Sequence, residues 1–66
     1  MKLTVNGQSR EVPDDQTVRQ LVQTLGLGRG AVAVEVNRKL VPRKEHEQTR
    51  LAEGDQIEIV TLVGGG

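Results

Sequence analysis

Few residues of this chain have the chemistry that catalysis or metal binding needs. Cysteine is absent and histidine occurs once, at His46, so neither a thiolate nor a group of histidines is available to a metal ion. His46 lies in the charged segment 44–47, where we expect a solvated surface histidine rather than a general base. No motif places a serine or cysteine beside a histidine as a nucleophile–base pair requires. The sequence therefore predicts that the chain is not itself an enzyme.

The acidic pairs and the spaced glycines have ordinary structural interpretations. Asp14-Asp15 precedes a predicted helix, where carboxylates commonly serve capping and the helix dipole. Residues 53–55, Glu-Gly-Asp, have the composition of a turn. Gly26, Gly28 and Gly30 are spaced like a phosphate-binding loop, but they follow a helix instead of opening one and no lysine–serine pair comes after them. We therefore predict no bound cofactor and no metal site.

Composition limits the size of the fold and the kinds of partner. The 66 residues suffice for one small domain, whose core must be aliphatic because Phe, Tyr and Trp are absent. Nine basic and nine acidic residues are interspersed, which leaves neither a basic stripe nor an aromatic platform for nucleic acid. No apolar run reaches membrane-spanning length, and no charged-then-apolar signal segment opens the chain. We expect no nucleic-acid or membrane partner, a cytoplasmic location and a monomer when free.

The hydrophobic pattern predicts strands around one helix. Strands are expected at residues 1–5 and 8–12, joined by Asn6-Gly7, which favours a two-residue hairpin turn. A T-x-x-Q capping box at Thr17 predicts the start of an amphipathic helix, and Gly26 predicts its end.

The second half of the chain completes a predicted sheet. Strands are expected at residues 31–36, 40–41 and 56–63, with at most one helical turn within 43–50. This order is that of the α+β ubiquitin-like β-grasp fold, a mixed sheet of four to five strands with one helix packed across it. The first and last strands would then be parallel neighbours at the centre of the sheet.

The last strand becomes apolar on both faces before the chain finishes in three glycines. Ile57 and Ile59 share one parity and are expected to face the helix, whereas Val60 and Leu62 share the other. Two interpretations of Val60 and Leu62 stay open here. They pack under a loop, or they form an exposed apolar surface that binds a partner.

The glycines themselves also allow two interpretations. Gly64, Gly65 and Gly66 are a frayed terminus or an expression remnant, or they are a working tail. Extended residues from Leu62 onward would reach about 17 Å beyond the sheet, and glycines can thread a slot too narrow for side chains. Such a tail would deliver its carboxylate to a partner's active site, where transfer of AMP from ATP would make the carbonyl open to a sulfur or nitrogen nucleophile.

Four segments of the chain together resemble the ThiS family of thiamine-biosynthesis sulfur carriers. The segments are VNGQSREV, TVRQLVQTLGL, VAVEVNRKLVPR and LAEGDQIEIVTLVGGG, in the family's order over essentially the whole chain. The pattern V-A-V-E-x-N-x-x-x-V-P-R, the pattern G-D-x-I-E-I-V and a diglycine end are specific in combination. Many relatives carry an aromatic residue after the Pro-Arg pair, near the place of His46, and this departure concerns partner docking rather than the tail.

The resemblance implies a carrier chemistry at the last residue. Gly66 would be adenylated by an E1-like enzyme of the ThiF type, which consumes ATP, and then converted to a thiocarboxylate with sulfur from a cysteine desulfurase and a persulfide donor. The thiocarboxylate would donate its sulfur to a thiazole synthase of the ThiG type. Gly64 and Gly65 would complete a flexible tail, residues 64–66, after a domain of residues 1–63, and Val60 and Leu62 would bind partners.

Other functions share this chemistry and stay open at this point. A small subunit of molybdopterin synthase has the same tail, but its relatives tend to be longer and carry prolines before the glycines. A ubiquitin-like modifier would join the same activated carboxylate to lysines of other proteins. Carriers that supply sulfur for tRNA thiolation or cysteine synthesis also end on diglycine, and a plain binding module with an inert tail is the remaining alternative.

Overall fold

The fold is known from a computed structural model that describes residues 1–27 and 30–62. The predictions for Gly64, Gly65 and Gly66, the expected domain boundary after residue 63 and the middle of the spaced glycines lie outside the described residues.

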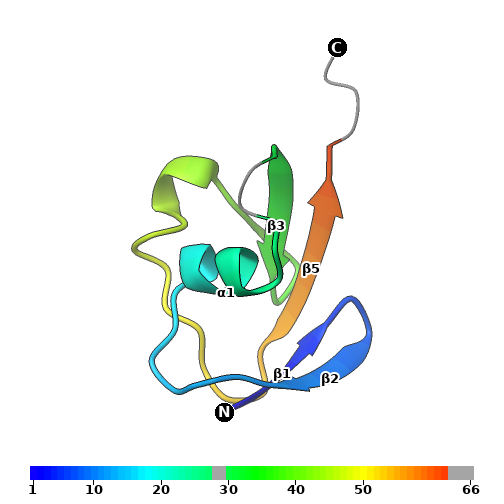
Figure 1. The fold of residues 1–66 in the computed structure, drawn as a ribbon, viewed down its shortest axis with the longest axis vertical. Coiled ribbons are helices and arrows are strands. Elements are labelled where there is room, and N and C mark those ends of the chain that lie inside the picture. Colours follow the sequence, from blue (N-terminus) through cyan, green and yellow to red (C-terminus); the bar gives the residue numbers. More distant parts are fainter. Residues whose placement is uncertain (28–29, 63–66) are drawn as a thin grey trace.

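Residues 1–27 and 30–62 fold into a five-stranded mixed sheet and one α-helix (Figure 1). The strands lie in the order β2-β1-β5-β3-β4; β1 and β5 are parallel, and the other neighbouring pairs are antiparallel. This arrangement confirms the predicted β-grasp topology, with the first and last strands side by side. The elements in chain order are β1 (Lys2–Val5), β2 (Gln8–Glu11), α1 (Val18–Thr24), β3 (Val32–Val36), β4 (Lys39–Val41), the 3₁₀ turn η1 (Arg43–Glu45) and β5 (Gln56–Thr61).

The two ends of α1 are built by local hydrogen bonds that the sequence predicted. The Thr17 hydroxyl accepts from the backbone N–H of Gln20, and the Gln20 side chain accepts from the backbone N–H of Thr17 at 2.9 Å, which is the capping box. At the other end Gly26 takes φ of +77° and the backbone N–H of Leu27 donates to the Val22 carbonyl at 3.0 Å. A glycine is favoured there because a side chain is strained at positive φ.

The core lies between α1 and the inner face of the sheet. Strand residues of one parity and the apolar stripe of α1 meet there, as the alternation and the helical spacing predicted. The buried apolar side chains are Leu3, Val5, Val12, Val18, Leu21, Val22, Val34, Val41, Leu51, Ile57 and Ile59.

No helix in the described part of the chain is long and apolar enough to cross a membrane.

The expectation that His46 is a solvated surface residue was wrong. Only 7% of His46 is exposed, and its Nε2 donates to the Val41 carbonyl at 3.0 Å. Its own carbonyl accepts from the backbone N–H of Arg19 at 3.0 Å. The η1 turn rotates this one side chain inward while its charged neighbours stay outside, so His46 ties the segment after β4 to α1.

The expectation that Asp14-Asp15 caps α1 was also wrong, because both carboxylates form ion pairs and neither bonds to the helix start. The Asp14 carboxylate lies 2.9 Å from the α-amino group of Met1, and Asp15 pairs with Arg50. Thr17 supplies the cap instead. These ion pairs join residues that are distant in sequence, so the local pattern around the helix start did not reveal them.

Candidate partner-binding surface

The alternation of side chains along β5 separates core residues from exposed ones. Ile57 and Ile59 are 1% and 6% exposed, whereas Val60 and Leu62 are 58% and 56% exposed. The interpretation that Val60 and Leu62 pack under a loop is therefore wrong within the described chain. Both side chains are therefore open to a partner.

Hydrogen bonds to β3 hold β5 in register up to the last described residue. Val60 lies opposite Ala33 in the antiparallel pair, and the backbone N–H of Leu62 donates to the Ala31 carbonyl at 2.9 Å. The exposed side chains therefore project from a backbone that is fixed by the sheet. The sheet thus presents both side chains a few residues before the C-terminal glycines of the sequence.

A third exposed apolar residue, which the sequence did not single out, belongs to the same face. Leu40 is 65% exposed and lies opposite Glu35, which in turn lies opposite Glu58 on β5. Val41, next to Leu40 on β4, is buried, so the parity of this short strand was the signal that could have identified Leu40. We call the sheet side away from α1 the outer face, and in β3–β5 it carries Ala33, Glu35, Leu40, Glu58 and Val60.

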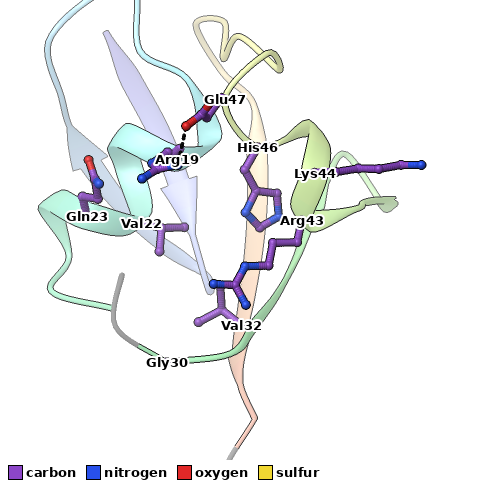
Figure 2. A pocket seen from close by; sticks show the side chains of 9 residues that line it. All are labelled: Arg19, Val22, Gln23, Gly30, Val32, Arg43, Lys44, His46 and Glu47. Carbon is purple, nitrogen blue, oxygen red and sulfur yellow. Dashed lines mark hydrogen bonds and ion pairs between the residues drawn. The ribbon is translucent and has the colours of Figure 1, made fainter.

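A hollow of about 390 Å³ lies on the other side of the molecule, between α1, the start of β3 and the segment 43–47 (Figure 2). Arg19 and Glu47 form an ion pair at its rim, and the His46 ring lies in its wall (Figure 2). Because Nε2 of His46 is used in the hydrogen bond to Val41, this ring has a structural role. No serine or threonine is among the residues that line the hollow, and no group of three or more His, Asp or Glu residues that could hold a metal ion is found in the described chain.

Sequence relatives and solved structures agree on one family. The family model described as ThiS family matches residues 3–66. The sulfur carrier protein ThiS of Escherichia coli K12 is 30% identical over 66 residues, which cover all of both chains. The crystal structure of the thiamine biosynthesis protein ThiS from Geobacter metallireducens superposes with a TM-score of 0.85 at 32% identity, again over all of both chains.

Larger relatives contain a similar stretch. The thiazole synthase of Paramagnetospirillum magneticum is 41% identical over 66 residues, and that of Magnetococcus marinus is 38% identical over 66 residues. Both matches cover all of this chain but only 20% of each relative, so the chain spans a fifth of their length.

In the part of the chain that the structure describes, one α-helix lies across a mixed five-stranded sheet with parallel β1 and β5, which defines a ubiquitin-like β-grasp protein. Within that class the chain belongs to the ThiS family, whose members include the small sulfur carrier proteins of thiamine biosynthesis.

Proposed function

We propose that this protein carries sulfur on the carboxylate of Gly66 and delivers it to thiazole formation in thiamine biosynthesis. The observation that carries the proposal is the match over the whole chain to a sulfur carrier protein, together with a family match that extends through Gly66. In this proposal residues 1–63 are the docking domain, and Gly64 and Gly65 give Gly66 its reach into a partner's active site.

The chemistry proposed at Gly66 has two stages. A carboxylate is a poor electrophile, so it first attacks the α-phosphorus of ATP on an E1-like adenylating enzyme of the ThiF type, and pyrophosphate leaves. The terminal sulfur of a persulfide, supplied through a cysteine desulfurase, then attacks the acyl adenylate and AMP leaves. A thiol breaks the resulting sulfur–sulfur bond and becomes oxidised to a disulfide, which leaves the thiocarboxylate.

The acceptor proposed for this sulfur is a thiazole synthase of the ThiG type. Support comes from the thiazole synthases of two bacteria, each of which includes a stretch similar to this whole chain. The exposed Val60 and Leu62 support docking beside the carrier end, because apolar side chains on a rigid strand give a partner area to bury. All catalytic groups and the ATP site belong to partners in this proposal, and the carrier acts as a cytoplasmic monomer when free.

Intact-mass analysis tests the proposal directly. The chain is incubated with ATP, the cognate activating enzyme, cysteine and the desulfurase, and the expected product has one carboxylate oxygen replaced by sulfur. Deletion of Gly65 and Gly66 should abolish the product, and a C-terminal amide at Gly66 should do the same while it keeps every residue.

Two outcomes would contradict the proposal. One is the absence of the oxygen-to-sulfur exchange in the native chain under conditions in which the activating enzyme releases pyrophosphate from ATP. The other is linkage of Gly66 to lysines of other proteins as the main product, which would assign the chain to the ubiquitin-like modifiers.

A further inference from the structure

Two glutamates occupy directly opposite positions on the outer face. The β3–β5 register pairs Glu35 with Glu58, and the alternation of side chains along both strands places them on the side away from α1. Like charges at directly opposite positions destabilise a sheet. Glu58 is exposed and Glu35 half-buried, and in the described part of the chain neither carboxylate takes part in an ion pair.

Elsewhere on the outer face, residues of opposite charge lie opposite each other on neighbouring strands. At the far end of the sheet Lys2 lies opposite Glu11 in the β1–β2 pair, which is the favourable arrangement. Arg38 shares a hollow with Glu58 but forms no ion pair with it. The unfavourable pair of Glu35 and Glu58 thus lies in the part of the sheet that contains β5, the strand that precedes the C-terminal glycines. A local conflict of this kind is typical of a functional surface.

Apolar side chains border the acidic pair on two sides. The next pair along the strands is Val60 with Ala33, and Leu40 lies opposite Glu35 on β4. Leu40 and Val60 are 65% and 58% exposed, so the pair borders open apolar side chains on these two sides. When a partner covers such a surface, water is removed and the interaction of the carboxylates with a partner's charges strengthens.

The negative charge of Glu35 and Glu58 indicates which kind of partner can bind the outer face around them. A second copy of the chain that used the same face would bring carboxylates against carboxylates. Nucleic acids and anionic lipid surfaces would be repelled in the same way. A protein surface with an apolar centre and lysine or arginine side chains beside it is complementary to the outer face both in its apolar area and in its charge.

We propose that the outer face around Glu35 and Glu58 docks the basic, partly apolar surface of a partner protein, and that the two carboxylates supply attraction at the cost of stability in the free chain. This inference rests on the proposed function, because the partner used to test it is the activating enzyme. It adds to Val60 and Leu62 a charged component and a third apolar contact, Leu40.

The test uses the double variant Glu35→Gln, Glu58→Gln and titration calorimetry with the cognate activating enzyme. At low salt we expect the variant to bind about tenfold more weakly, because it loses the attraction of both carboxylates for the partner's basic side chains; tenfold corresponds to about 1.4 kcal/mol. The affinity of the native chain should fall with added salt, and that of the variant should fall less. Glu45→Gln on η1, also an exposed glutamate, is the matched control and should bind as the native chain does.

Thermal unfolding of the free proteins gives a second readout that a merely structural role would not reproduce. Removal of the repulsion should leave the midpoint of the double variant equal to or above that of the native chain. Glu58→Lys would convert the pair with Glu35 into an attractive one, so it should raise the midpoint while weakening binding further.

Unchanged affinity and an unchanged salt dependence in the double variant would overturn the inference, as would dimerisation of the native chain through this face. If the native chain still forms a thiocarboxylate in that case, the proposed function stands without it. Failure of the native chain to take up sulfur would count against the proposed function itself.

Discussion

The side chain of Asn6 makes two hydrogen bonds to the backbone of Ile59, 53 residues away in sequence. Its Oδ1 accepts from the Ile59 N–H at 2.8 Å, and its Nδ2 donates to the Ile59 carbonyl at 3.1 Å. The backbone N–H of Asn6 donates to the Ile57 carbonyl at 2.9 Å. Asn6 therefore continues the pairing of β1 with β5 beyond the end of β1, immediately before the exposed Val60.

Replacement of Asn6 by glycine distinguishes the contribution of its side-chain hydrogen bonds from its contribution to the turn. Asn6 has φ of +49°, which glycine adopts without strain, so Asn6→Gly retains the turn and removes both side-chain bonds. The two part-buried backbone groups of Ile59 would lose their partner, and we expect a loss of about 1–3 kcal/mol in the free energy of unfolding, measured by urea denaturation. Asn6→Asp retains the acceptor oxygen, so its free energy of unfolding should lie between that of the native chain and that of Asn6→Gly. A neutral Asn6→Gly variant would show that Asn6 serves the turn alone.

His46→Ala tests the structural role of the buried imidazole. The variant leaves the Val41 carbonyl without its donor and enlarges the hollow beside α1, so unfolding should become easier by about 1–3 kcal/mol. Gln48→Ala, an exposed change in the same segment, should stay within about 0.5 kcal/mol. Thiocarboxylate formation by folded His46→Ala should match that of the native chain. Loss of sulfur uptake without loss of stability would instead place His46 in the chemistry.

The α-amino group of Met1 makes stability depend on pH. Its pKa is raised above the ordinary value of 8.0, first by the hydrogen bond with Asp14 and also by the charges of Asp14, Glu11 and Glu53, against an opposing effect of desolvation. Because the folded pKa exceeds the unfolded one, this contribution is complete below about pH 8 and is lost as the pH rises through the folded value.

Thermal unfolding between about pH 7 and about pH 10 measures this effect. The midpoint temperature of the native chain should fall as the pH rises across this range, and the fall should be smaller in Asp14→Asn. Asp15→Asn is the neighbouring control, because Asp15 pairs with Arg50, whose charge does not change in this range. Equal pH profiles for the native chain and Asp14→Asn would exclude the Met1–Asp14 pair as the cause.

Leu62→Asp tests the proposed partner surface without touching the core. Leu62 is 56% exposed, so its replacement should change the free energy of unfolding by no more than about 0.5 kcal/mol. A charge in an apolar interface should weaken binding to the activating enzyme by about tenfold or more. Gln8→Asp on the exposed edge strand β2 provides the control for an added negative charge. Unchanged affinity for Leu62→Asp would place the interface elsewhere.

Local sequence signals predicted the elements of this fold well. The capping box at Thr17, the glycine at the end of α1 and the alternation of β5 depend on φ, ψ and the side-chain period of each element. Each of these properties is decided within a few residues. The β-grasp topology followed from the order of these elements, since few arrangements bury one amphipathic helix on such a sheet.

The sequence by itself determined where strands and helix form and which face of each is apolar. Only the tertiary structure decided which outward side chains stay uncovered: His46 turned inward, Val60 and Leu62 remained exposed, and Leu40 joined them on the outer face. The pairing of Glu35 with Glu58 likewise depends on the register of strands far apart in the chain. Exposure and cross-strand contact are set by what other segments pack on a residue, and no local pattern contains that information.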